Sequence, residues 1–201
     1  MALSTFAELK SSIADWLNRD DLTSVIPDFI TLAEAQMNRS IRHWRMEKRV
    51  ETTLDEQYEN LPSDFLETLE LTLTDGDMLT LIATADMQRR KRDSVTSGKP
   101  KYYRVSSDQF EFYPAPDSSY TLSLQYYGKT PALSDSNTSN WILEYAPDLY
   151  LYGSLLQAAP YLGDDVRVQT WGALYGSALQ AIEQENMTAK YSGPLKMGVP
   201  K

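Results

Sequence analysis

Few side chains in this sequence have the types and spacing that enzyme chemistry needs. The 201 residues include one histidine and no cysteine. The sequence therefore has too few of the residues that a Ser-His-Asp arrangement, or a metal site built from histidines and thiolates, would need. The histidine, His43, lies between Arg42 and Trp44, where a helix is expected to end. A capping role or an interaction with the helix dipole explains that position better than general-base catalysis does.

Carboxylates occur in two adjacent pairs, Asp20-Asp21 and Asp164-Asp165, and each pair precedes an expected helix. Capping accounts for both pairs, although two carboxylates brought together in space would also serve a glycosidase. The stretch 135–140 has the alternate oxygen spacing of a calcium loop. However, Asn140 stands where such a loop needs glycine, and Ala146 where it needs a bidentate glutamate, so we interpret it as a turn-rich linker. We expect no catalytic residue, no metal and no cofactor.

Positive charge is concentrated in two segments, Arg39–Arg49 and Arg89–Arg104, whereas acids dominate residues 134–190. The run Arg89 to Arg92 lies near Tyr102 and Tyr103, and such a cluster can pair phosphates and stack on bases. The net charge of -9 argues against a chain whose main task is to hold nucleic acid. We therefore interpret the basic segments as a protein contact surface, with the candidates Arg42, Arg45, Arg89, Arg90 and Arg92.

The composition is that of an ordinary globular protein, with 42% apolar and 11% aromatic residues. No apolar run approaches the length of a membrane span, and the first ten residues do not have the pattern of a signal peptide. We therefore expect a soluble protein that is made without export.

Helical periodicity marks both ends of the sequence. Thr5 and Glu8 form a capping box, and the apolar stripe Phe6, Leu9, Ile13 and Trp16 follows. A second helix is expected from Ser24, with apolar spacing that continues to Ile41 and Trp44, and it would form an antiparallel hairpin with the first.

Two more helices are expected near the C-terminus. One begins at Pro147 and ends at Pro160, and the last begins at Asp164-Asp165. The stripe of the last helix comprises Val168, Trp171, Tyr175, Ala178 and Ile182. Gly172 and Gly176, one turn apart, favour close helix packing within or between subunits.

From Val50 the apolar period changes to two, which indicates strands. A turn at Asp75-Gly76-Asp77, with Gly76 or Asp77 left-handed, would place Leu73 opposite Leu79 and Leu71 opposite Leu81. A short polar helix is expected at 84–92. A second hairpin would pair the arm carrying Phe110 and Phe112 with Tyr120–Tyr126, and the solvated face of that pair would carry Glu111, Thr121, Ser123 and Gln125.

The sequence thus predicts an α+β fold in which an antiparallel β module is inserted into a helical body. The helical body combines an N-terminal hairpin with two C-terminal helices. The expected divisions are 1–48 for the hairpin, 49–133 for the β module with its short helix, 134–190 for the C-terminal helices and 191–201 for an extended arm.

Three segments resemble the head-to-tail adaptor, or connector, proteins of tailed bacteriophages, also called tail accessory factors. The first runs from Thr5 to Arg19 and continues through Pro27–Ile30 to Ile41-Arg42. The middle one comprises Leu61–Leu66 and Tyr113–Asp117 leading into Tyr120–Tyr127. The last comprises Leu133–Asp135, Asn140-Trp141, Ala146–Gly153 and Trp171–Tyr175. Together they span nearly the whole chain in the order of the family.

The resemblance implies a structural, non-enzymatic protein of the virion neck that is made in the host bacterial cytoplasm. It implies a homo-oligomeric ring, twelvefold, docked beneath the portal protein, with helices around a DNA channel and a β module facing tail or nozzle proteins. Genomic DNA would pass close to the ring only transiently and without specific contacts.

Two further expectations combine this resemblance with the charge and composition of the chain. The C-terminal arm has apolar anchors for the portal or a neighbouring subunit, namely Tyr191, Leu195, Met197 and Val199. A channel that lets a genome slide through should not be strongly basic, so we expect acids of the C-terminal helices at the lumen, namely Asp164, Glu183 and Glu185.

Two other function classes stay open from the sequence. One is a ligand- or glycan-binding β module on a helical stalk, for virion attachment, with Tyr102, Tyr103, Tyr126 and Tyr127 as its platform. The other is a cell-wall hydrolase that uses carboxylates whose places in the fold the sequence does not give.

Overall fold

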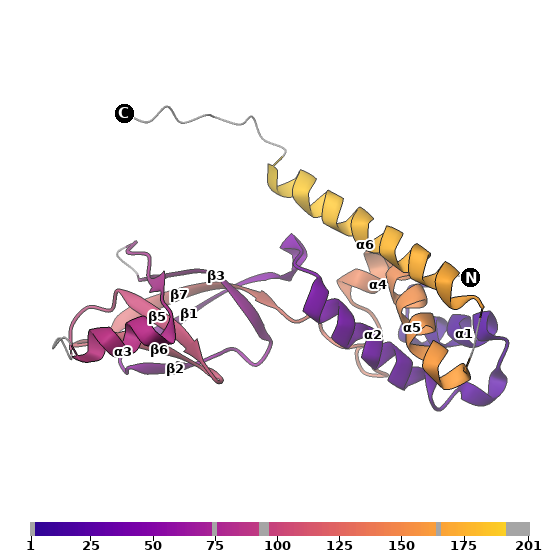
Figure 1. Ribbon diagram of the computed structural model, residues 1–201, viewed down its shortest axis with the longest axis horizontal. Coiled ribbons are helices and arrows are strands. Elements are labelled where there is room, and N and C mark those ends of the chain that lie inside the picture. Colours follow the sequence, from indigo (N-terminus) through magenta and orange to yellow (C-terminus); the bar gives the residue numbers. More distant parts are fainter. Residues whose placement is uncertain (1–2, 74–75, 93–96, 164–165, 192–201) are drawn as a thin grey trace. The chain divides into compact units, whose positions relative to one another are not determined.

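A computed structural model describes residues 3–73, 76–92, 97–163 and 166–191 of the chain (Figure 1). The fold is α+β, as the sequence predicts. The chain divides into two compact units. The helical unit comprises residues 1–46 and 130–201, and the β unit comprises residues 47–129. The β unit is thus inserted into the helical unit.

The helical unit is organised around one central helix. Its helices are α1 (Phe6–Leu17), α2 (Ile26–Ser40), α4 (Trp141–Tyr145), α5 (Pro147–Leu162) and α6 (Val168–Tyr191), with short 3-10 turns at Asp20–Leu22 and Trp44–Met46. Each of the other four helices packs against α5. Leu149, Leu155 and Ala158 of α5 are fully buried, which makes this helix apolar around most of its circumference.

Local signals set the first helix boundaries. The predicted capping box is present, because the Thr5 side chain accepts from the Glu8 N–H while the Glu8 carboxylate accepts from the Thr5 N–H. Asn18 adopts the left-handed conformation and ends α1. Of the predicted stripe, Phe6, Leu9 and Ile13 are buried, whereas Trp16 is exposed and meets the ring of Tyr152 edge-on.

Two helix ends differ from those that the sequence predicts, at Trp44 from apolar spacing and at Pro160 from the proline. Helix α2 ends at Ser40, and Ile41 is already extended. The Arg42 guanidinium donates to the carbonyls of Asn38 and Ile41, which favours termination there because a cation stabilises the negative end of a helix. Helix α5 continues past Pro160 to Leu162.

A buried carboxylate of α2 binds the segment that follows the β unit and leads into the C-terminal helices. Glu34 Oε1 accepts hydrogen bonds from the Leu133 N–H, at 2.7 Å, and from the Tyr150 hydroxyl, at 2.9 Å. The Asn140 amide donates to Tyr150 Oη and to the Pro131 carbonyl. Burial raises the pKa of Glu34, against the opposing effect of the two hydrogen bonds that it accepts. The segment 130–140 is thereby held on the helices without secondary structure of its own.

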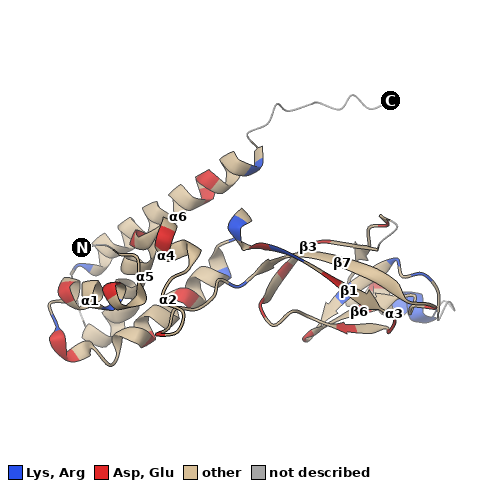
Figure 2. Cartoon of the chain, turned by 180° about the vertical axis from the view of Figure 1, so that it is seen from behind, with Lys and Arg blue, Asp and Glu red and all other residues tan. Residues whose placement is uncertain are grey.

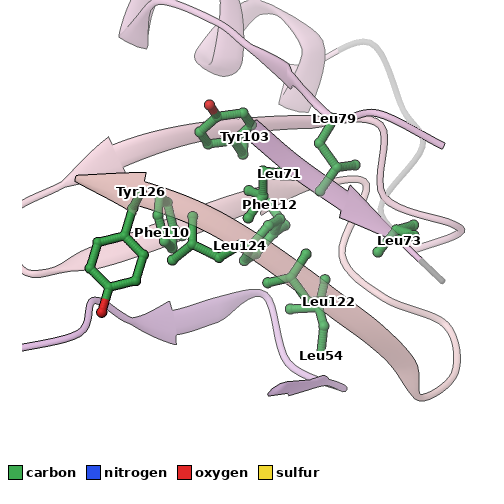
Figure 3. Packing of buried hydrophobic residues seen from close by; sticks show 10 residues of the cluster. All are labelled: Leu54, Leu71, Leu73, Leu79, Tyr103, Phe110, Phe112, Leu122, Leu124 and Tyr126. Atoms are coloured by element: carbon green, nitrogen blue, oxygen red, sulfur yellow. The ribbon is translucent and has the colours of Figure 1, made fainter. Parts of the chain in front are cut away.

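The β unit is a pair of sheets packed face to face. One sheet has the order β1 (Glu47–Leu54), β7 (Tyr120–Gly128) and β3 (Phe65–Leu73). The other has the order β2 (Tyr58–Asn60), β6 (Gln109–Tyr113), β5 (Tyr102–Ser106) and β4 (Thr80–Leu81). Between them lies one apolar cluster, in which Leu122 and Leu124 of β7 meet Phe110 and Phe112 of β6 (Figure 3). Glu47 and Tyr127 are antiparallel partners, so the first and last strands of the insert lie side by side.

The predicted hairpin of Phe110–Phe112 with Tyr120–Tyr126 is wrong. β6 pairs with β2 and β5, whereas β7 pairs with β1 and β3, so the two segments belong to opposite sheets. The residues of both segments still face one core, and this is why their alternation resembled that of a hairpin. Glu111 does not belong to a solvated face, because its side chain is only 1% exposed.

The predicted pairing across the turn at Gly76 is displaced by two residues. The Leu79 N–H donates to the Leu71 carbonyl, and Thr72 forms a bridge with Met78, so Leu71 lies opposite Leu79 and not Leu81. A shift of two preserves the face of each side chain, and both leucines are buried. Gly76 has the predicted left-handed conformation, with φ of 83°.

An ion-pair cluster holds α3 (Thr84–Arg92) on the outer face of the second sheet. The Glu111 carboxylate of β6 pairs with Lys91 of α3 and with Arg104 of β5. Burial raises the pKa of Glu111, but the hydrogen bonds from Lys91 and Arg104 outweigh it and place the pKa below the ordinary value. The predicted polar helix at 84–92 is thus confirmed, and its basic run is in part a structural anchor.

Replacing Gly153 of α5 should destabilise the helical unit. A Cβ at this position would lie 3.1 Å from the Tyr175 ring and 3.4 Å from the Ala33 Cβ. We expect Gly153→Leu to lower the free energy of unfolding by about 1 to 3 kcal/mol, through overpacking. The control is Gly176→Ala, where a Cβ would meet no other part of the described chain within 4 Å, and it should raise stability by up to about 1 kcal/mol. Urea unfolding followed by tryptophan fluorescence measures both. If the two variants changed the free energy of unfolding equally, the close packing inferred at Gly153 would be contradicted.

The Glu111 cluster should make the β unit sensitive to acid. The pKa of Glu111 in the folded protein lies below that of an unfolded glutamate. The stability that ionised Glu111 contributes is therefore present above the pKa of an unfolded glutamate. It is lost as the pH falls through the lower pKa that Glu111 has in the folded protein. Glu111→Gln should cost about 2 kcal/mol or more at neutral pH and flatten this dependence. Hydrogen exchange at residues 84–92 and 109–113 between pH 7 and pH 3 measures the effect. Glu56→Gln, at an exposed turn position, is the control, and an equal change in both variants would refute the role of Glu111.

Candidate interaction surfaces

The described residues contain no group of three or more histidines or carboxylates that could hold a metal ion. No helix among them is both long enough and apolar enough to cross a membrane. The single histidine is fully buried in the helical unit. Its ring stacks on Trp141, with 4.9 Å between centroids, and its Nδ1 accepts from the Arg45 N–H. His43 thus contributes to packing and to the turn at 43–46.

An arginine and two aromatic rings form a partly exposed patch on the helical unit. We call Trp44, Arg45 and Tyr145 the arginine-aromatic patch. The Arg45 guanidinium lies 4.5 Å from the centroid of the Trp44 ring and 4.7 Å from that of Tyr145. Trp44 is 39% exposed and Tyr145 is 49% exposed. Tryptophan, tyrosine and arginine are the residues that dominate binding energy in protein interfaces.

Helix α6 holds this patch in place. The Asn186 amide donates to the Arg42 carbonyl, and its oxygen accepts from the Trp44 N–H at 2.9 Å. A hydrogen bond to Glu185 raises the pKa of Tyr145. The patch is therefore built by the 3-10 turn Trp44–Met46 and by α4, and the consecutive residues Glu185 and Asn186 connect it to α6. Stacking between rings also orients the guanidinium, which lowers the entropy that a partner would have to remove.

The outer face of α6 lacks charge over most of its length. No charged residue occurs from Val168 to Ile182, and the first acid is Glu183 (Figure 2). The predicted stripe is confirmed for Trp171, Tyr175, Ala178 and Ile182, which are buried. The opposite side exposes apolar and small side chains, including Ala173, Leu174 and Ser177. A solvated helix face normally carries charged residues, so an uncharged one is typical of a packing surface.

The two glycines of α6 do not make the predicted close contact within the described chain. A Cβ on Gly172 would only reach the end of Leu156 at 4.0 Å, and one on Gly176 would meet nothing within 4 Å. Among the helices described, the close approach occurs instead at Gly153 of α5, where a Cβ would lie 3.1 Å from the Tyr175 ring. Packing of Gly172 and Gly176 against another subunit stays a prediction.

Of the predicted basic contact residues, most already have partners within the chain. Arg42 caps α2, and Arg89 pairs with Asp86 at 2.7 Å. The Arg90 guanidinium lies 3.9 Å from the centroid of the Tyr102 ring. Arg45 belongs to the arginine-aromatic patch, and Arg92 ends α3 with an exposed side chain. The five arginines lie in different units, because residues 42 and 45 belong to the helical unit and residues 89, 90 and 92 to the β unit.

Some of the other predicted site residues lie at the end of α6, and the rest lie outside the described part of the chain. Glu183 is exposed and Glu185 is half-buried on the last turns of α6, and Tyr191 is the exposed final residue of that helix. Asp164, Leu195, Met197 and Val199 lie outside the described residues.

The tyrosine platform of the alternative hypothesis is not formed. Tyr103, Tyr126 and Tyr127 are buried, and Tyr103 and Tyr126 belong to the core of the β unit (Figure 3). Tyr102 is covered by Arg90. Aromatic residues on alternating strands pack the core here, so they cannot offer their faces to a sugar.

The β unit carries an open cleft that the sequence did not reveal. Its volume is about 280 Å³, and its lining residues come from β1, β2, β6 and β7, with the loop after β2: Val50, Glu51, Thr52, Glu59, Asn60, Leu61, Pro62, Phe110, Leu122 and Leu124. β1 and β2 are edge strands of the two opposed sheets. The cleft lies between these edges and reaches the apolar core. Sequence alternation identifies strands but not which of them form the edges, so no signal for this cleft was readable.

Comparison with known protein families assigns the chain. Residues 4–198 match the family described as SU10 adaptor protein, which consists of phage head-tail adaptors. No curated protein matches the chain significantly. The match covers the helical unit, the inserted β unit and nearly all of the C-terminal segment. The chain therefore belongs to the SU10 adaptor protein family and is a structural adaptor of a bacteriophage.

Proposed function

We propose that this chain is the repeating subunit of a ring, twelvefold, that docks beneath the portal protein and continues the DNA exit channel to the tail. The observation that carries the proposal is the family match over residues 4–198. In this arrangement the helical unit surrounds the channel and contacts the portal, and the β unit faces tail or nozzle proteins. The chain acts by assembly and performs no catalysis.

The surfaces of the helical unit support assembly. A ring built by one repeated contact needs two different complementary patches on each subunit. The outer face of α6 and the arginine-aromatic patch differ in chemistry, since the first carries uncharged side chains from Val168 to Ile182 and the second presents a stacked cation. The arginine-aromatic patch has the composition expected of an interface centre, where aromatic residues and arginine are enriched.

The basic contact residues divide into two roles in this proposal. Arg45, Arg89 and Arg92 contact neighbouring proteins, because their side chains are exposed. Arg42 and Arg90 position the surface around them, because each is only partly exposed and has a contact within the chain.

The assembly itself is the decisive test of this function. The purified chain should be mixed with the portal protein of its own phage and examined by native mass spectrometry and electron microscopy. We expect a closed ring of many copies bound coaxially to the portal. A chain that stays monomeric beside an intact portal, and is absent from the neck of assembled virions, would overturn the proposal.

The C-terminal arm should be required for docking but not for folding. Truncation after Lys190 removes Tyr191 and the ten residues that follow the described structure. The core residues all precede this point, so the truncated chain should unfold at a temperature within a few degrees of the full chain. Its binding to the portal should be weaker by tenfold or more, as measured by sedimentation of the mixture. If the truncated chain bound the portal as tightly as the full chain does, the arm would not be a contact in the assembly.

The acids near the end of α6 should affect the movement of DNA. If Glu183, Glu185 and Asp164 line the channel, a basic substitution would bind the passing phosphates and release their counterions. Glu183→Lys should therefore slow genome ejection from assembled virions, and added salt should reverse the effect. Glu56→Lys makes the same charge change on the β unit and should leave ejection unchanged. Equal ejection rates for the two variants would place Glu183 away from the channel.

A further inference from the structure

The open cleft of the β unit has no occupant within the described chain, although it reaches the apolar core. Its floor consists of Phe110, Leu122 and Leu124, and Val50 at its rim is 38% exposed. Val50, Thr52 and Leu54 alternate along β1 on the side that faces the opposite sheet, since they pair with Leu124, Leu122 and Tyr120 of β7. An extended segment laid along β1 could place every second side chain over this floor.

The rim of the cleft carries two carboxylates, those of Glu51 and Glu59. Glu51 pairs with Arg49 at 2.8 Å, and Glu59 accepts from the Thr52 hydroxyl at 3.3 Å. Neither the floor nor the rim residues that line the cleft include a basic side chain. An occupant with apolar side chains at every second position and with lysines between or beyond them would therefore match both the shape and the charge of this site.

The chain itself contains a segment with this pattern. Residues 192–201 follow the last described residue and form the longest stretch outside the described structure. Leu195, Met197 and Val199 recur at intervals of two, and the segment carries Lys196 and Lys201 but no acid. Ten extended residues span roughly 33 Å, which exceeds the length of the eight-residue strand β1. The other stretches outside the described structure have two to four residues and are too short to follow a strand.

We propose that residues 192–201 of one copy bind in the β-unit cleft of another copy as an added strand beside β1. Leu195, Met197 and Val199 then lie over Phe110, Leu122 and Leu124, and the lysines lie toward Glu51 and Glu59. When each copy gives its segment to one neighbour and receives a segment from another, the contact is head-to-tail, and repeated contacts of this kind close into a ring where their rotation allows it. This inference rests on the proposed ring assembly and names one contact that would join its neighbours.

The absence of cysteine in the natural chain allows a direct test by cross-linking. Two full-length variants, one with Val50→Cys and the other with Met197→Cys, carry different affinity tags and are mixed in equal amounts. They are oxidised with and without the portal protein. We expect a disulfide between differently tagged chains. The matched control replaces Val50→Cys by Thr53→Cys, which lies on β1 with its side chain on the outer face of the sheet, opposite Thr121. It should cross-link at least tenfold less.

The outcomes separate this inference from the proposed function. No disulfide in either condition, or equal yields for Val50→Cys and Thr53→Cys, would overturn the cleft as the binding site, whether or not rings form. A disulfide found only within single chains of a double variant carrying both cysteines would also overturn it, because the segment would then fill the cleft of its own copy. Rings that form on the portal without the cross-link would leave the adaptor function intact. A specific cross-link without any portal association would instead contradict the adaptor function alone.

Discussion

The packing of four helices against α5 is the constraint on which the helical unit depends. Because α1, α2, α4 and α6 all contact this one helix, its side chains must be small or apolar on nearly every side. At Gly153 the lack of a side chain leaves room for Tyr175 and Ala33, which approach this position closely. One consequence concerns α6, which buries one side against α5 and leaves the other side exposed.

Each unit also uses one buried carboxylate to fix a segment that packing alone would leave loosely defined. Glu34 holds the irregular linker 130–140 against α2 through a backbone N–H and a tyrosine hydroxyl. Glu111 holds α3 on its sheet through a lysine and an arginine. The two environments shift the pKa of the carboxyl group in opposite directions, since burial dominates at Glu34 and the cationic partners dominate at Glu111. In both cases the directional hydrogen bonds of a buried carboxylate fix the position of a segment, whereas apolar contacts have no directional preference.

Local interactions were readable from the sequence, and partners distant in the chain were not. The capping box at Thr5 and Glu8, the left-handed Gly76 and the buried stripe of α6 each depend on residues within a few positions of one another. The sheet partners of Phe110 and Leu122 depend on which strands meet after the whole insert has folded, and two facing strands have the same alternation as two adjacent ones. The cleft lies between two strand edges, and the arginine-aromatic patch joins residues about a hundred positions apart. Family resemblance could be recognised because the order of several short segments is a property of the whole chain.

The pairing of Glu47 with Tyr127 brings the two ends of the inserted unit to neighbouring positions on adjacent strands. An insert whose ends lie together interrupts its host at a single point, so it can be lengthened, trimmed or replaced without changing the helices on either side. The geometry of β1 and β7 therefore permits exchange of the β unit by recombination between related genomes. Such exchange would let the surface of this unit diverge rapidly while the interlocked helices retain their shape.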